Sequence, residues 1–132
     1  MGKVPTLAVL LALSCAATTL QAQTRGDIVQ LQEKFLSSRF AAERCGAVDE
    51  GDKHKFMLNF MDVTLQSIQV LKEKNPAWSD DDLKRNIAER TNFLQNNVAS
   101  EIEKNGCKSS LIQQLLALYR VHSEMDLSAG RR

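Results

Sequence analysis

Two histidines are the residues of this chain best suited to acid–base or metal chemistry at neutral pH. His122 and Asp126 are four residues apart, so on a helix they would share one face and could supply half of a metal site. No second pair of ligands accompanies them, and we expect His122 to be a histidine satisfied at the edge of the core. His54 lies between Lys53 and Lys55, where we expect a solvated helix start. The sequence therefore predicts neither a metal site nor a cofactor.

Two cysteines, Cys45 and Cys107, could act as nucleophiles only as free thiolates. A dyad of Cys107 with His122 would be such an arrangement. Of the three cysteines, however, Cys15 lies in the predicted signal peptide 1–22, and the two that remain in an exported protein are expected to form a disulfide. Without CxxC spacing, a zinc knuckle or a thioredoxin-like redox site is not expected. We predict a disulfide between Cys45 and Cys107, with two separate free thiols as the alternative.

A third candidate for chemistry is the run of carboxylates Asp80, Asp81 and Asp82. Consecutive residues point in different directions on a helix, and acidic residues are favourable in a helix's first turn, so a helix start explains the run better than a cation site does. The chain contains no glycine-rich phosphate loop, nucleophile elbow, HExxH motif or EF-hand pattern. We therefore expect a protein that is not an enzyme.

The first 22 residues have the plan of a secretory signal peptide: a short basic start, an apolar run over 4–14, and a small and polar stretch that ends at Ala22. We expect cleavage between Ala22 and Gln23 and a periplasmic or secreted protein. As an alternative, the segment from Leu11 to Cys15 resembles a bacterial lipobox, in which Cys15 would carry a lipid anchor. No other apolar stretch is long enough to span a bilayer, so we expect no transmembrane segment.

The charge balance excludes several classes of partner. The chain has 17 Lys and Arg against 16 Asp and Glu, a formal net charge of +1, which argues against binding to nucleic acid. Aromatic residues make up only 5%, so stacking platforms for bases or sugars are not expected. The hydrophobic content of 43% and charged content of 25% are those of an ordinary globular domain.

Four segments carry apolar residues at spacings of three and four, which predicts four amphipathic helices. They cover about 27–45, 53–74, the stretch after Ser79 to 105, and 109–125. We expect the first helix to begin at Asp27 and to end at Gly46 in the left-handed conformation. Pro76 ends the second helix. At the start of the third helix, Ser79 and Asp82 have nearly the spacing of a capping box. The expected buried stripe of the second helix is Met57, Phe60, Met61, Thr64, Ile68 and Leu71.

Short connections between these helices predict an all-α, antiparallel up-down-up-down four-helix bundle over 23–127, after the signal peptide 1–22 and before a flexible tail 128–132. In that topology Cys45, at the end of the first helix, and Cys107, between the third and fourth, lie at the same end of the bundle. The predicted topology and the predicted disulfide therefore agree. Phe56, Met57, Phe60 and Met61 form an apolar cluster wider than one stripe, which we interpret as core, with an adaptable docking surface as the alternative.

The connectors are the best candidates for binding a partner. Trp78 is the only tryptophan and lies in a short linker next to Asp80, and the linker before the second helix carries Asp49, Glu50 and Asp52. A tryptophan in such a place could anchor an interface or cap the end of the bundle. We expect these five residues to contact a partner, which would be another protein of the cell envelope. The protein itself would be a monomer or a homodimer.

In architecture and compartment the predicted protein is similar to small exported immunity proteins that block toxic cell-wall enzymes, a likeness without shared motif residues. An immunity-like or inhibitor-like binding protein is therefore the first hypothesis. If Cys15 is lipidated, a pilotin-like secretion accessory lipoprotein with a peptide groove between its helices is the alternative. A periplasmic stress chaperone, which uncovers apolar surface in acid or on reduction, is the third hypothesis.

Overall fold

The computed structural model describes residues 16–46 and 48–127, and these residues form four α-helices and no strand. The prediction of an all-α protein is confirmed. Helix α1 covers Ala16–Cys45, α2 Glu50–Lys74, α3 Asp80–Asn105 and α4 Ser110–Glu124. Helix α1 begins before the expected Asp27 and runs through the predicted cleavage position. Residues 1–15 of the predicted signal peptide and the predicted tail 128–132 lie outside the described residues.

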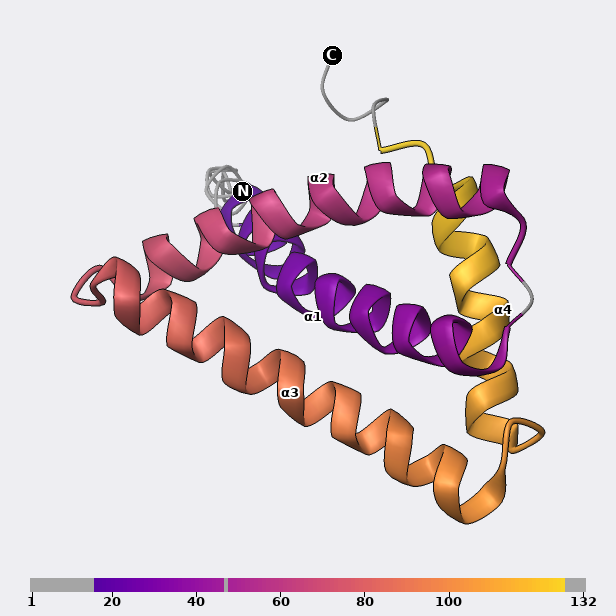
Figure 1. Ribbon diagram of the computed structural model, residues 1–132. Coiled ribbons are helices and arrows are strands. Elements are labelled where there is room, and N and C mark those ends of the chain that lie inside the picture. The colour runs from indigo at the N-terminus through magenta and orange to yellow at the C-terminus, as the bar shows by residue number, and fades with distance from the viewer. Residues whose placement is uncertain (1–15, 47, 128–132) are drawn as a thin grey trace, which may run out of the picture.

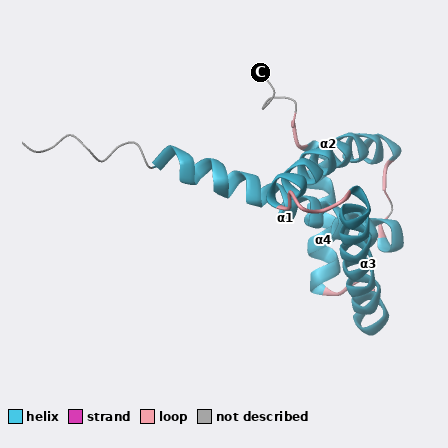
Figure 2. Cartoon of the chain, turned by 90° about the vertical axis from the view of Figure 1, so that its left-hand side faces the viewer, coloured by secondary structure: helices cyan, strands magenta, loops and turns pink. Residues whose placement is uncertain are grey.

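The first three helices alternate in direction, as the predicted up-down order requires (Figure 1). Helices α2 and α3 diverge from their common turn, and α1 lies between them and packs against both. Helix α4 departs from the predicted bundle, because it crosses the other helices steeply at their open side and packs mainly against α1 and α2. With 15 residues it is too short to run along the whole of α3, which has 26. The N-terminal part of α1 projects beyond the other helices (Figure 2).

The ends of α2 and α3 follow the predicted local signals. Helix α2 stops before Pro76, and α3 begins with a complete capping box: Asp82 N–H donates to Ser79 Oγ at 3.1 Å, and Ser79 N–H donates to the Asp82 carboxylate at 3.0 Å. At its other end, Gly106 adopts φ 74° and donates its N–H to the Ile102 carbonyl at 2.8 Å. These contacts satisfy backbone groups that a helix end leaves without partners.

Gly46 ends α1 for a different reason from the expected one. Among the described glycines only Gly106 has a positive φ, so the expected left-handed conformation of Gly46 is wrong. A Cβ at Gly46 would lie 3.1 Å from the Ala42 carbonyl oxygen and 3.2 Å from Leu116 Cδ2. A side chain here would require its neighbours to shift by a few tenths of an ångström, because the end of α1 lies close to α4.

The core consists of an aromatic cluster and a smaller aliphatic one. In the first, the Phe56 ring lies 5.2 Å from Phe35 and 4.1 Å from Tyr119, which joins α1, α2 and α4. In the second, Ala41, Val98 and Ile112 join α1, α3 and α4. The two clusters lie on different sides of α1, so that helix is the central element of the fold.

The predicted disulfide is confirmed. Cys45 and Cys107 are bonded, with their Cα atoms 5.5 Å apart and a separation of 62 positions in sequence. The bond joins the end of α1 to the turn between α3 and α4. These two places lie close together, as predicted. The bond lies next to the aliphatic cluster, which Cys45 contacts.

The face of α2 that is most deeply buried is rotated from the predicted one, and apart from Met61 the residues of the predicted stripe are half-buried. The buried residues are Phe56, Val63, Ser67 and Val70, one position off the expected stripe. Met61, expected inside, has 58% of its surface exposed. The aromatic cluster explains the rotation, because Phe56 enters between Phe35 and Tyr119 and thereby sets which side of the helix faces inward.

Candidate functional site

A cavity of about 130 Å³ lies where α2 and α3 diverge over α1, and we call it the three-helix cavity. Its lining residues come from all three helices. The apolar part of its lining consists of Val29, Leu36, Ile68, Leu71 and Ile87, and the buried Ser67 and half-buried Thr64 add two hydroxyl groups. The polar residues nearest the surface are the exposed Arg90 and the half-buried Gln32, Asn86 and Thr91. An apolar interior with a few polar groups at its rim is typical of a binding site.

Thr64 on α2 lines the three-helix cavity, and its hydroxyl is unusual. Its Oγ1 is buried and has no hydrogen-bond partner, the one such buried side-chain atom in the described part of the chain. A buried hydroxyl without a partner costs about 1–3 kcal/mol. Valine has nearly the same shape without this cost, so the sequence carries at this position a polar group that the fold itself does not use.

An ion pair joins two helices at the rim of the cavity. Arg90 Nε of α3 donates to Glu33 Oε1 of α1. Arg90 is mostly exposed, so the pair contributes little to stability. The pair matters for the charge of the rim: Glu33 balances the guanidinium charge of Arg90, so the rim carries no net charge at this place.

Two of the predicted partner-binding residues lie at the turn between α2 and α3. Trp78 has 38% of its surface exposed, and Asp80 forms an ion pair with Lys72 at 3.2 Å. Both line a hollow of about 210 Å³ together with Pro76 and Leu83. Trp78 is therefore partly packed against the fold and partly exposed to a partner, and the hollow beside it is larger than the three-helix cavity.

The other three predicted residues lie at the opposite end of α2. Asp49 precedes the helix, and Glu50 and Asp52 are in its first turn. Since α2 has 25 residues, its two ends are about 37 Å apart. The structure thus separates the five predicted residues into two groups. Glu50 lines a hollow of about 480 Å³ whose wall includes Tyr119, a residue whose pKa is raised mainly by burial.

His122 lies deeper in the core than the expected edge position, with 1% of its surface exposed. Its ring stacks on Phe35 at 3.8 Å between centroids, and its Nδ1 lies 3.1 Å from Ser38 Oγ. Burial, with a smaller contribution from the charge of Lys34, lowers the pKa of His122 to about 4. The imidazole is therefore neutral at pH 7. Among the described residues no group of three or more His, Cys, Asp or Glu side chains is arranged to hold a metal ion.

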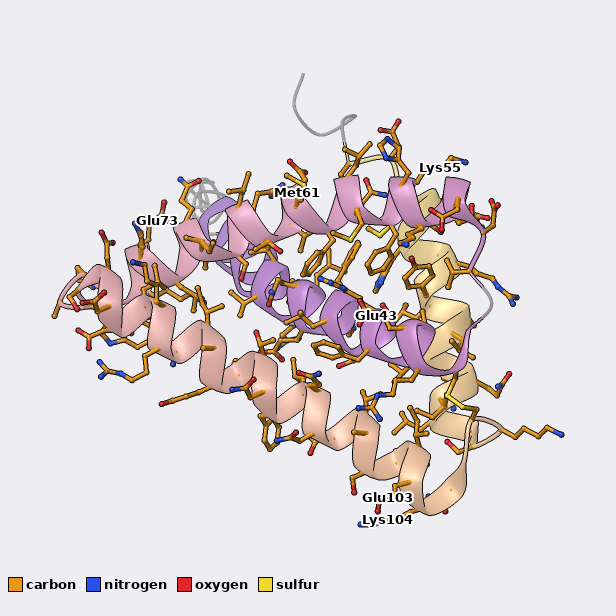
Figure 3. All side chains as sticks on the ribbon, viewed as in Figure 1. Glu43, Lys55, Met61, Glu73, Glu103 and Lys104 are labelled. Carbon is orange, nitrogen blue, oxygen red and sulfur yellow. A yellow bond between two sulfur atoms is a disulfide. The ribbon has the colours of Figure 1, made fainter. Side chains whose placement is uncertain are left out.

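An exposed apolar stripe on α2 was expected only in part: the alternative of a docking surface included Met61 but not Leu58 or Leu65. Leu58, Met61 and Leu65 are each more than half exposed, and Met61 is labelled in Figure 3. Beside them is a hollow of about 440 Å³ to which Met125 and Leu127 contribute. The apolar cluster of the sequence is thus divided: Phe56 belongs to the core, and Met61 to the surface. Positions 58, 61 and 65 have the spacing of one helix face, which could have indicated the stripe. The buried residues of α2 have the same kind of spacing, so the sequence alone does not tell which face is exposed.

In the residues that the structure describes, no helix combines the length and the apolar character needed to cross a membrane. Compared with known proteins, the chain matches no family model, no curated protein and no solved structure.

Proposed function

We propose that this is an exported, periplasmic binding protein without enzymatic activity, which acts by holding part of another envelope protein in the three-helix cavity. The observation that supports this best is the divergence of α2 and α3 over α1, which leaves an apolar hollow with a polar rim. A helix or an extended segment laid along such a hollow buries its apolar side chains and keeps its polar groups at the rim.

The polar groups of the cavity support binding rather than catalysis. Its lining contains amides, hydroxyls and Arg90, whose charge is balanced by Glu33. Such groups orient a ligand through hydrogen bonds, but they include neither an acid–base pair nor an activated nucleophile. His122, the residue best suited to proton transfer, lies in the aromatic cluster and is not part of the cavity's wall.

The two modes of binding suggested by the sequence use different surfaces. An immunity-like or inhibitor-like protein would insert a connector into its partner, either Trp78 with Asp80 or the acidic start of α2. A pilotin-like lipoprotein would receive a partner segment in a groove between helices. We favour the receiving mode, because the cavity is a concave surface formed by three helices, whereas the connector residues are split between the two ends of α2. Lipidation of Cys15 remains a proposal within this alternative.

A stress chaperone is a second candidate function, favoured by one observation. The neutral, buried His122 is stacked within the aromatic cluster, so its protonation in acid would favour opening of that cluster. Apolar surface that is covered at neutral pH would then become available to unfolded proteins.

The first experiment is affinity capture from an envelope extract, with the captured protein identified and then quantified for each variant. Ile87→Gln places a polar amide in the wall of the three-helix cavity, and we expect it to lower capture about tenfold, the effect of roughly 1.4 kcal/mol. Phe93→Ala, an exposed position on the same helix and outside the cavity, is the matched control and should leave capture unchanged.

The outcomes of this capture separate the modes. Loss of capture with Trp78→Ala but not with Ile87→Gln would contradict the cavity and support the inhibitor-like mode. If all variants capture the same protein equally well, the proposed site is wrong. Circular dichroism of each variant shows whether the helices are intact.

A further inference from the structure

We propose that the three-helix cavity accepts the side chain of a tyrosine from the partner, with the phenol hydroxyl bonded to Thr64 Oγ1. This inference rests on the proposed function and specifies the ligand of the same site. Three properties of the cavity support it: its volume, the unused hydroxyl of Thr64, and the balanced charge of its rim.

The volume selects a single six-membered ring. The cavity measures about 130 Å³, and an apolar protein cavity of roughly 150 Å³ holds one benzene molecule. The walls that would contact the ring are the aliphatic side chains of Leu36, Ile68 and Ile87. A ring of this size fills the hollow, whereas the larger indole of tryptophan would exceed its volume.

The hydroxyl of Thr64 distinguishes tyrosine from phenylalanine. Oγ1 has no partner in the structure, so a ligand that brings a hydroxyl group supplies the missing hydrogen bond. Oγ1 is closed off from solvent, but Thr64 itself lines the cavity, and a χ1 rotation of roughly 120° can move Oγ1 into the position of the methyl group. Threonine populates two χ1 rotamers in helices, and this rotation breaks no existing hydrogen bond of the side chain.

The rim favours a neutral ligand group with its backbone outside. Arg90 is paired with Glu33, so neither a carboxylate nor an ammonium group finds an unbalanced charge there. Asn86 and Gln32, both half-buried, offer amide groups to the peptide backbone that carries the ring. The phenol of tyrosine is neutral at pH 7, which fits this arrangement.

The test compares p-cresol with toluene, which mimic the side chains of tyrosine and phenylalanine, by NMR titration of the whole protein. We expect both to shift signals of the cavity residues, and p-cresol to bind roughly three- to tenfold more tightly, the effect of one neutral hydrogen bond. Thr64→Val should abolish this preference while toluene still binds. Ser100→Ala, which removes a hydroxyl group from α3 outside the cavity, should retain the preference.

Several results would overturn the inference. These are no binding of either compound, equal binding of both to the wild type, or a preference that survives in Thr64→Val. A second comparison uses N-acetyl-tyrosinamide. If p-cresol binds and this compound does not, the cavity takes a free phenolic molecule and the assignment to a partner's tyrosine is wrong.

The two proposals can fail separately. Loss of partner capture in Ile87→Gln, together with no preference for p-cresol, would retain the proposed function and reject tyrosine as the ligand. Binding of p-cresol with the expected preference, together with unchanged capture in Ile87→Gln, would reject the proposed function and leave a small-molecule site.

Discussion

His122 shows how much of this core depends on one protonation state. The imidazole stacks on Phe35 and lies within hydrogen-bonding distance of Ser38 Oγ, with almost no contact with water. Asn59 of α2 donates to the carbonyls of His122 and Met125, at 2.8 and 2.9 Å, and thereby fixes the end of α4 beside the ring. A positive charge at this place would be poorly solvated and close to Lys34, which explains the low pKa of His122.

We predict that the protein loses stability as the pH falls from about 6.5 to about 4. The folded-state pKa of His122 is lowered to about 4 from 6.5, so unfolding takes up a proton over this range. The contribution of the neutral His122 to the free energy of unfolding is fully present above pH 6.5. At pH 4 about 3 kcal/mol of it is lost. Guanidinium unfolding between pH 7.5 and 4.5 measures it.

Two histidine variants serve as the comparison for this prediction. His122→Phe should show a much smaller pH dependence than the wild type, since its ring does not titrate. His54→Gln, at an exposed histidine of α2, should retain the pH dependence of the wild type. Equal pH dependence in His122→Phe and the wild type would show that another group controls acid stability.

The sequence indicated that His122 belongs to the core, but not how deep it lies. Its partner Ser38 is 84 residues away in the chain, and no local spacing relates the two. The same holds for Thr64, which the sequence analysis placed on a buried stripe. Whether its hydroxyl finds a partner depends on the neighbouring helices, which become known only when the structure brings α1, α2 and α3 together.

At the scale of the helices, the termini are the best predicted features because their contacts are local. Ser79 and Asp82 are three residues apart, and their reciprocal hydrogen bonds depend on nothing outside this turn. Ser109 likewise accepts a hydrogen bond from Ile112 N–H at 3.2 Å at the start of α4. The buried face of α2 was predicted one residue off, since it depends on where Phe35 and Tyr119 place the Phe56 ring.

We predict that Ser79→Ala lowers the free energy of unfolding by about 1 kcal/mol, because the Asp82 N–H loses its acceptor at the start of α3. Ser79→Thr keeps a hydroxyl at the cap and should lose less. Urea unfolding at pH 7 compares the three proteins. Equal stability of Ser79→Ala and the wild type would mean that water replaces the cap without cost.

For the whole molecule, the all-α class and the disulfide were predicted correctly, because both follow from the periodicity of the chain and the positions of two cysteines. The divergence of α2 and α3 was not. It depends on α4, which crosses the open side, and on Gly46, where the lack of a side chain lets α1 approach Leu116. The three-helix cavity is a product of this divergence and therefore could not be predicted from local patterns.

We predict that reduction of the disulfide lowers the melting temperature by roughly 15 °C or more. A bond across 62 residues removes unfolded-state entropy worth about 4 kcal/mol in the chain-entropy model, and a small domain loses about 4–8 °C per kcal/mol. Thermal unfolding with and without reductant measures the change. A Cys45→Ser/Cys107→Ser double variant should melt at the reduced midpoint and be insensitive to reductant. An unchanged midpoint in the reduced wild type would show that the bond does not stabilise the fold.

The bond between Cys45 and Cys107 also gives the chain a closed ring, which contains all of α2 and α3, while α1 and α4 lead away from it. A single peptide bond cut inside the ring, for example at the turn after Pro76, opens the ring without dividing the molecule. The two pieces stay covalently joined; the first retains α1 and α2 of the aromatic cluster and the second retains α4. When the disulfide is reduced, a cut at the same peptide bond yields two fragments with no covalent link. The redox state therefore decides whether one cut leaves one covalent molecule or two.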